Sequence, residues 1–364
     1  EKWYSQASLM TLQNITNQGN ALFVTERYVR RKGDKSPLRK PPVYFTEFKF
    51  MEKIKELNEL MKAFGEAGGD KGIFANKDIA HLAASGHKIL SMRDVEGLEV
   101  QAKETLHGIS AKVIVKEGVR IKHPVHLCFG ILHKKGTQKI KMDVKLQKDA
   151  SVHFIAHCIF PKAEKVKHIM DAVVDVGENS EMRYSETHYH GLYGGIEVIP
   201  KATIKVGKNG RFFTDFNLII GRVGKLSIDY DTDAGENTVV EMTARVFGHA
   251  DDDIKIKEKV ILNGENARGL IKTRVALEDE AKAEVINTTE GNAAGARGHV
   301  DCMEIVKDNA IAKAIPIVNV THPRAKVTHE AAIGSVDKRQ LETMMAHGLT
   351  PEEAVDVIVK GILK

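Results

Sequence analysis

Side chains that commonly bind metals are concentrated in two short segments near the C-terminal end of the chain. They are His299, Asp301, Cys302 and Glu304 in residues 296–306, and His329 and Glu330 in residues 324–334. Imidazole, thiolate and carboxylate groups together suit iron or zinc, and a thiolate favours the softer choices, which include iron–sulfur clusters. The two segments hold only one thiol, so a full cluster needs a second subunit or non-cysteine ligands. The alternative is a polar sheet end in which Cys302 is only a small core residue.

A second set of candidate residues recurs at a fixed spacing. Cys128, Cys158 and His188 are separated by 30 and 30 residues. Two further histidines, His126 and His190, lie two residues from the ends of this series. If one structural repeat has this length, the three residues stack at the ~4.8 Å strand spacing, where thiols could bind a metal or relay sulfur. Cysteine is also among the most buried residue types, and the alternative is that these cysteines only pack.

The composition limits the class of protein. The chain has 364 residues, of which 42% are hydrophobic, enough for a sizeable core. Its three scattered cysteines do not form a disulfide framework, so a reducing, cytoplasmic setting is expected. We find no secretion signal, no apolar run that could span a membrane and no nucleotide-binding signature. The net charge of +5 does not by itself indicate a nucleic-acid partner.

The spacing of turns predicts a repeating β structure. From about Leu98, short runs rich in Val, Ile and Thr alternate with turns of Gly, Asn, Asp and Glu. The most similar turns, at intervals of 30, 30, 28 and 29 residues, are centred on Asp149, Asn179, Asn209, Asn237 and Asn266. Weaker turns lie about midway between them. A fixed period of this kind is typical of a stacked repeat, and the β-rich runs without helical spacing indicate that its units are strands.

We therefore predict an all-β core over residues 98–334, a right-handed parallel β-helix of two sheets, with α-helical regions at both ends. Residues one coil apart, about 29 positions, then lie on neighbouring strands of one sheet. Glu330 follows Asp301 by 29 residues and Cys302 by 28, so the two ligand-rich segments should be neighbours. Adjacent strand residues point to opposite faces, so Asp301 and Cys302 cannot both face Glu330 in a regular strand. Cys158 and Cys302 should lie about five coils apart, on the order of 24 Å.

Residues 1–97 are predicted to form a helical region with a basic linker. Met51–Phe64 has its apolar residues on one helical face and is followed by Gly65, a residue typical of a helix C-terminus. Asn76 could cap a second helix that extends through Ser85. The segment Arg27–Lys40 contains seven Arg and Lys residues. We interpret this segment as a solvated linker, the alternative being an anion-binding arm.

Residues 335–364 are predicted to form two helices. Ser335 is the expected N-cap of the first, which runs to His347. Thr350–Glu353 gives the second a capping box with proline at the first helical position. The two helices could cover the last coil, which would otherwise expose unpaired backbone groups, or they could form a docking surface.

The C-terminal sequence from Ala325 to Leu363 closely resembles the signature of the SufB/SufD family, the scaffold subunits of the SUF iron–sulfur cluster assembly system. Its most specific parts are a His-Glu-Ala and a later Gly-Leu-x-x-Glu-Glu-Ala helix start. Glu330 matches the Glu of SufB, where SufD-type subunits tend to have Gly, so the chain is more similar to SufB. Upstream, Ala-Arg before Cys302 resembles the family's Ala-Arg-x-x-x-x-Cys. The resulting candidates for metal ligands are Cys302, Glu330, His329 and Asp301.

This resemblance implies a fold, a function and partners. Family members are parallel β-helices with helical ends that pair as SufB–SufD heterodimers or SufB-like homodimers, and the modest length suggests a minimal, archaeal-type homodimer. The implied function is a cytoplasmic scaffold that is no enzyme, carries a transient iron–sulfur cluster and binds no nucleotide itself. The C-terminal helical region docks a SufC-type ABC ATPase, for which the candidate contacts are Leu349, Glu352, Glu353 and Val357. SufB-type proteins accept sulfur at a cysteine inside the β-helix, for which the relay candidates are Cys128, Cys158 and His188.

Two other functions are compatible with a β-helix. One is an enzyme acting on acidic polysaccharide, which would need a surface groove of Asp and Arg and usually a secretion signal, and neither is evident. The other is a purely structural β-helix that binds a protein partner. A neighbouring ATPase gene would favour the assembly function over both.

Overall fold

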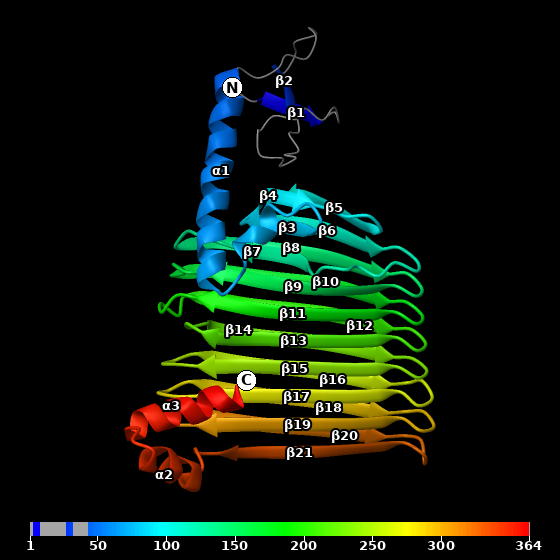
Figure 1. Ribbon diagram of the computed structural model, residues 1–364, viewed down its shortest axis with the longest axis vertical. Helices are drawn as coiled ribbons and strands as arrows, with labels where there is room; N and C mark the ends of the chain where they lie inside the picture. Colours follow the sequence, from blue (N-terminus) through cyan, green and yellow to red (C-terminus); the bar gives the residue numbers. More distant parts are fainter. Residues whose placement is uncertain (1–2, 8–26, 32–42, 364) are drawn as a thin grey trace.

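Two long β-sheets with helices at both ends make up most of the protein, as the computed structural model shows in Figure 1. The structure describes residues 3–7, 27–31 and 43–363. In order from the C-terminal edge, the ten-stranded sheet contains β21 (Lys326–Gly334), β19 (Arg297–Val306), β17 (Arg268–Leu277), β15 (Val239–Gly248), β13 (Arg211–Ile220), β11 (Glu181–His190), β9 (Ser151–Phe160), β7 (Val125–Gly130), β3 (His81–Ser85) and β4 (Lys88–Arg93). The nine-stranded sheet contains β20 (Ile311–Val320), β18 (Lys282–Gly291), β16 (Asp253–Leu262), β14 (Gly224–Ala234), β12 (Ile196–Val206), β10 (Lys165–Val176), β8 (Lys135–Leu146), β6 (Gly108–Val115) and β5 (Leu98–Thr105).

From β7 onward, successive strands alternate between the two sheets, and each pairs in parallel with the strand one coil away. This arrangement confirms the predicted parallel β-helix of two sheets. Within each strand, buried and solvent-facing residues alternate, so one side chain in two points into the space between the sheets. These inward side chains form one continuous apolar core along the length of the β-helix. At its N-terminal end the sheets close with two antiparallel hairpins, β3–β4 and β5–β6.

The predicted turns carry left-handed backbone conformations. Asp149, Asn179, Asn209, Asn237 and Asn266 all have φ between 55° and 58°, a region that Asn and Asp tolerate better than other residues with a Cβ. Three of their side-chain amides donate to the residue one coil earlier, at 2.9 Å from Asn179 to Asp149, 2.8 Å from Asn209 to Asn179 and 3.3 Å from Asn266 to Asn237. The turn chemistry that set the period in the sequence therefore also links neighbouring coils.

The N-terminal region contains one long helix and strands. Helix α1 (Val43–Glu66) includes the predicted Met51–Phe64 helix, and it buries Leu60 and Phe64 against the outer face of the ten-stranded sheet. The predicted second helix is wrong, because its residues include strand β3, which follows the short 3₁₀ helix η1 (Lys71–Phe74). All five residues of β3 are buried, since the core covers one face and α1 packs near the other, so the alternation that marks a strand is missing. In the basic segment, Arg27–Arg31 is strand β2, paired with β1 (Trp3–Ala7), and residues 32–40 lie outside the described residues.

The C-terminal helices pack against the side of the β-helix. Helix α2 (Lys338–Ala346) is capped by Asp337 rather than the predicted Ser335, and α3 (Pro351–Ile362) has the predicted capping box. Val359 of α3 and Leu363 after it contact Ala276 and Ile305 on the outer face of the ten-stranded sheet. The helices therefore do not cover the last coil, and no described strand pairs with the outer edges of β20 and β21. None of the helices in the described part of the chain is long and apolar enough to cross a membrane.

Candidate functional site

The two ligand-rich segments near the C-terminal end are neighbouring strands, as predicted. In the register of β19 and β21, Asp301 pairs with Glu330, and Cys302 pairs with Ala331. One coil is therefore 29 residues long at this point, the interval from Asp301 to Glu330. Asp301 and Glu330 lie on the outer face of the sheet, whereas Cys302 points into the β-helix and is almost fully buried. His329 pairs with Val300, so it follows the inward side of the last strand, on the same face as Cys302.

On the outer face, Asp301 forms an ion pair with Arg274. Asp301 Oδ2 accepts a hydrogen bond of 2.5 Å from Nη2 of Arg274, and this bond holds the pKa of Asp301 below its ordinary value. Glu330 on the edge strand is exposed. A single chain therefore brings Asp301 together with Glu330, and it keeps Cys302 on the opposite face of the sheet from Glu330.

Cys302 has polar neighbours inside the β-helix that sequence reasoning did not select. Asn287 Nδ2 lies 3.2 Å from its Sγ, and burial raises the pKa of the thiol to about 11. Glu304, two residues further on the same inward face, has its pKa raised to about 7 by burial. Both carboxylate oxygens of Glu304 are buried without a hydrogen-bond partner in the described part of the chain. Glu304 was visible in the sequence as one of the clustered ligand types, and the structure shows that the face it shares with Cys302 is the inward one.

Polar side chains continue from Cys302 along the interior of the β-helix. Asn287 donates to Thr273 Oγ1 at 2.7 Å, and the Thr273 hydroxyl lies 3.5 Å from the carboxylate of Glu258. Glu258 pairs in register with Tyr230 on β14, and all four of these side chains are buried. We call Tyr230, Glu258, Thr273 and Asn287 the interior polar row. The row extends from Cys302 toward Glu186 on β11. Burial and the nearby carboxylate of Glu186 raise the pKa of Tyr230.

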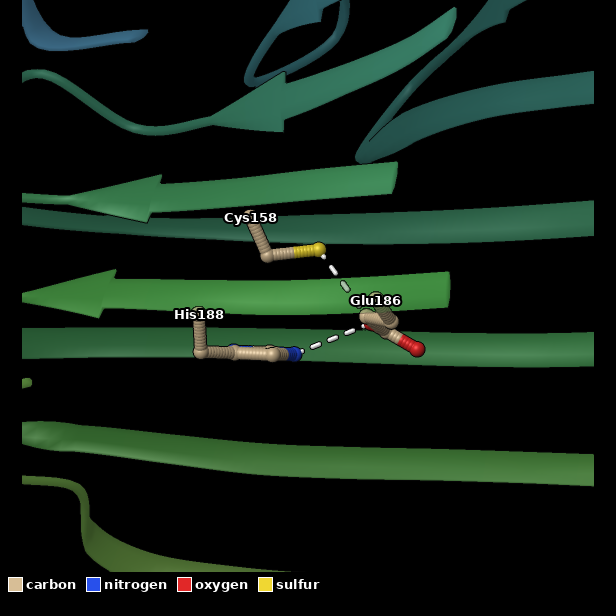
Figure 2. Close-up of side chains that lie close together, drawn as sticks. All are labelled: Cys158, Glu186 and His188. Carbon is tan, nitrogen blue, oxygen red and sulfur yellow. Dashed lines mark hydrogen bonds and ion pairs between the residues drawn. The ribbon is translucent and has the colours of Figure 1, made fainter. Parts of the chain in front are cut away.

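At the other end of the interior polar row lies a compact group of titratable side chains. Figure 2 shows Glu186 placed between the thiol of Cys158 on β9 and the imidazole of His188 on β11. The thiol lies 3.3 Å from Glu186 Oε1, and Nε2 of His188 lies 2.9 Å from the same oxygen. On the facing sheet, His168 Nε2 is 3.7 Å from the Cys158 sulfur. Cys158 and His188 are register partners, so the predicted stacking of these two residues is confirmed.

The hydrogen bonds in this group determine which nitrogen atoms carry a proton. His190 Nδ1 lies 3.2 Å from the carbonyl oxygen of Arg222, so it must donate, and burial lowers the pKa of His190 so far that its ring is neutral. Its Nε2 then accepts from Nδ1 of His188 at 3.1 Å. With Nδ1 of His188 occupied by a proton, one further proton is shared between its Nε2 and Glu186. Burial alone would raise the pKa of Glu186, but its hydrogen bond to His188 holds it below the ordinary value.

The predicted position of Cys128 in this stack is wrong. Cys128 pairs with His157, and Phe129 pairs with Cys158, so one residue separates Cys128 from the required register. A shift of one residue turns a side chain to the other face. Cys128 consequently points outward and packs under α1 with Leu60 and Ile159, where burial raises its pKa.

The candidate contacts for an ATPase lie on and just before α3. Glu352, Glu353 and Val357 are exposed, and Leu349 is half-buried. Glu353 also closes the capping box, because its carboxylate accepts from the backbone N–H of Thr350 at 2.8 Å. The apolar side of α3 is turned to the β-helix, so these side chains remain available on the other side of the helix.

Comparison with known proteins identifies the family. Residues 131–362 match the family described as SUF system FeS cluster assembly, SufBD core domain. The chain belongs to the SufBD family. An iron–sulfur cluster assembly SufBD family protein of Methanocaldococcus jannaschii is 42% identical over 276 residues, which are 76% of this chain and 87% of that protein. Another, from Pyrococcus horikoshii, is 36% identical over 310 residues, or 85% and 94% of the two chains.

The SufBD match covers the candidate residues at both sites. Cys158, Glu186 and Cys302 inside the β-helix and Glu330 on its outer face all lie within the matched region, and Cys128 lies outside it. Membership confirms the resemblance noted in the C-terminal sequence and assigns the protein to iron–sulfur cluster assembly.

Proposed function

We propose that this SufBD protein is a scaffold on which iron–sulfur clusters are assembled and from which they are transferred, and that it works as a cytoplasmic dimer with an ABC-type ATPase. The observation that carries this proposal is the C-terminal end of the β-helix. There Cys302 and His329 lie on the inward face of the last two strands of the ten-stranded sheet, beside two sheet edges that nothing described covers. The cluster is the cargo of this site.

The uncovered edges support the dimer. Strands β20 and β21 end the two sheets, and each presents a row of backbone groups without a described partner strand. Their side chains are unusually apolar for a surface, with Ile317 43% and Ile333 48% exposed. A second copy related by a two-fold axis would cover both edges at once and would double every ligand near Cys302. Two copies together would provide two Cys302 thiols, whereas one chain provides only one at this end.

In this dimer the ligands of the nascent cluster come from both copies. Cys302 and His329 would supply the inward ligands, and Glu330 with Asp301 would supply carboxylates from the outer face of the paired strands. A thiolate, an imidazole and carboxylates are all accepted iron ligands. Because burial keeps the Cys302 thiol protonated at neutral pH, iron must displace that proton when it binds.

Sulfur delivery is proposed to start at Cys158, with His188 beside it. The two thiols of Cys158 and Cys302 are about five coils apart, on the order of 24 Å, so they cannot exchange sulfur directly. The interior polar row lies between them and offers hydrogen-bonding groups along an otherwise apolar core. Cys128 has no part in this path because it faces the other side of its sheet.

The ATPase partner is proposed to dock on α3 through Leu349, Glu352, Glu353 and Val357. Helix α3 packs on β19 through Ile305, three residues after Cys302. A force on α3 would therefore reach the strand that carries the cluster ligand. Rearrangement of the ATPase on binding ATP could in this way open or close the dimer interface.

Anaerobic reconstitution with iron and sulfide tests the cluster site. We expect the wild-type protein to develop iron–sulfur absorbance and the double variant Cys302→Ser, Glu330→Ala to lose most of it, since a thiolate and a carboxylate are removed from each copy. Cys128→Ser is the matched control because it also removes a buried thiol, and it should keep the absorbance. Unchanged absorbance in a folded double variant would sink the assignment.

Sedimentation velocity tests the dimer. The double variant Ile317→Lys, Ile333→Lys places one charge at each edge of the proposed interface. Burying these charges against a second copy would cost several kcal/mol. We expect this double variant to be monomeric at concentrations at which the wild type is a dimer. Val173→Lys, at a residue 55% exposed on β10 in the middle of its sheet, is the control and should leave the dimer intact. A wild-type protein that is monomeric throughout would contradict the proposal.

A further inference from the structure

We propose that Cys158, Glu186 and His188, with His168 as a fourth donor, form a binding site for one divalent transition-metal ion inside the β-helix. The site is separate from the C-terminal end and needs only one chain. It therefore stands whether or not clusters are assembled at Cys302.

The distances between the donor atoms suit a single ion. In a tetrahedral shell with bonds of about 2.3 Å to sulfur and about 2.0–2.1 Å to nitrogen or oxygen, donor atoms lie roughly 3.3–3.6 Å from one another. Here Cys158 Sγ lies 3.3 Å from Glu186 Oε1, and that oxygen lies 2.9 Å from His188 Nε2. All three donor atoms lie within 4.8 Å of one another. The two distances to Glu186 Oε1 are therefore within about 0.5 Å of those in such a shell.

The surroundings supply a fourth donor and an orienting contact. His168 Nε2 lies 3.7 Å from the sulfur, on a strand of the facing sheet. His168 is buried in the β-helix like the other three donors. His188 is held through its other nitrogen by His190 at 3.1 Å. A second hydrogen bond of this kind fixes the ring of a metal-binding histidine and directs its free nitrogen at the ion.

Hydrogen bonds within the group leave buried atoms unsatisfied. Glu186 Oε2 and His168 Nδ1 are both buried, and neither has a hydrogen-bond partner in the part of the chain that the structure describes. Glu186 is only 1% exposed. A group that served packing alone would be expected to pair such atoms, because a buried polar atom without a partner costs about 1–3 kcal/mol. An ion bound by both oxygens of Glu186 would remove one of these costs.

The charges of the ligands favour a divalent ion. A thiolate and a carboxylate carry two negative charges, and neutral imidazoles carry none. A divalent ion therefore leaves the buried group without net charge, whereas a monovalent or trivalent ion would leave a net charge in a low-dielectric interior, which is strongly unfavourable.

The donor set also selects the chemical class of the ion. One thiolate, one carboxylate and two imidazoles favour Zn²⁺ or Fe²⁺ over Mg²⁺ or Ca²⁺, which prefer oxygen ligands alone. An ion on Cys158 would also occupy the sulfur that the proposed relay needs. The metal-bound and sulfur-accepting forms of Cys158 would then be mutually exclusive.

Cobalt is the spectroscopic probe for this site, because a thiolate bound to Co²⁺ gives an intense charge-transfer band. The experiment uses the full-length Cys302→Ser protein, metal-free and anaerobic, so that the C-terminal end contributes no thiolate. We expect one equivalent of Co²⁺ to give the band, Zn²⁺ to abolish it by competition, and Mg²⁺ in excess to leave it unchanged. Fe²⁺ added in place of Zn²⁺ decides which of the two ions competes better. Because the site is enclosed, Co²⁺ is added both to the folded protein and during refolding.

Three variants in the same background assign the ligands. Cys158→Ser should abolish the band, and Glu186→Gln, which keeps the size of the side chain, should weaken binding at least tenfold. Cys128→Ser should have no effect, because this buried thiol lies on the other face of the sheet. A band that persists in Cys158→Ser, or absence of the band in both the folded and the refolded protein, would overturn the proposal. Thermal unfolding of each variant shows that loss of the band is not loss of the fold, and His168→Gln serves as a milder ligand change should Glu186→Gln fail to fold.

Discussion

Glu258→Gln is expected to stabilise the protein by about 3 kcal/mol at pH 7. Glu258 is fully enclosed in the β-helix, and burial raises its pKa from 4.5 to about 8. Between these two values the unfolded chain loses the proton while the folded protein keeps it. Stability contributed by this group is therefore complete below about pH 4.5 and falls by about 1.4 kcal/mol per pH unit as the pH rises toward 8. Glutamine keeps the shape and the hydrogen bond to Thr273 but has no proton to lose.

Denaturant unfolding measured from pH 5 to pH 8 checks this prediction. The stability difference between Glu258→Gln and the wild type should grow with pH, by about 1.4 kcal/mol per pH unit up to about pH 8. Glu241→Gln, an exposed glutamate of β15, is the control and should follow the wild type. A Glu258→Gln protein that is less stable than the wild type at pH 7 would show that the buried carboxylate is ionised and paired. A neutral Glu258 also leaves the interior polar row uncharged at its centre.

The fold was predictable because its turns have a chemistry that only a few residues satisfy. Asn and Asp adopt the left-handed conformation that each corner needs, so they recur wherever a coil ends, and their spacing gives the length of the coil. The same length predicted that the Cys302 and Glu330 segments are neighbours. Counting left the register open, because intervals of 28 and 29 residues both fit one coil, and the structure pairs Asp301 with Glu330.

The same counting failed for Cys128 because coils differ by one residue. Between β9 and β11 the coil is 30 residues long, so Cys158 and His188 are aligned. Between β7 and β9 the coil is one residue shorter, since Cys128 pairs with His157. Side chains alternate along a strand, so this difference moves the thiol from the inside of the β-helix to the outside. No feature of the sequence between these strands reveals which length applies.

The interior polar groups were missed for a different reason. Glu258 and Asn287 each occupy an inward position in a strand whose other inward residues are mostly apolar. A polar residue at an inward position of such a strand indicates an interior polar site. The sequence alone would show it if one knew which face of the strand points inward. The face is known only once the register is fixed, and the contacts across the two sheets, such as His168 to Cys158, appear only in three dimensions.

Phe216→Ala is expected to destabilise the protein by about 3–5 kcal/mol, the usual cost of removing a fully buried phenylalanine. Phe216 is paired with Glu186 on the neighbouring strand, and its ring centroid lies 4.9 Å from that of His188. The matched control is Phe213→Ala, three residues earlier on the outer face of the same strand, where the ring is only half-buried. Denaturant unfolding should separate the two variants by about 2 kcal/mol or more, since the control leaves no internal cavity.

The damage from Phe216→Ala should also be local, because each coil of a stacked repeat contacts mainly its neighbours. Hydrogen exchange should speed up in β11, β13 and β15, whereas β19 and β21, three and four coils away in the same sheet, should keep their protection. The variant would then loosen the group around Cys158 without touching the strands that carry Cys302 and Glu330. Uniform loss of protection along the β-helix would instead mean that the whole solenoid unfolds as one cooperative unit. Iron–sulfur reconstitution that survives in this variant would show that the C-terminal site folds and functions independently of the interior group at Cys158.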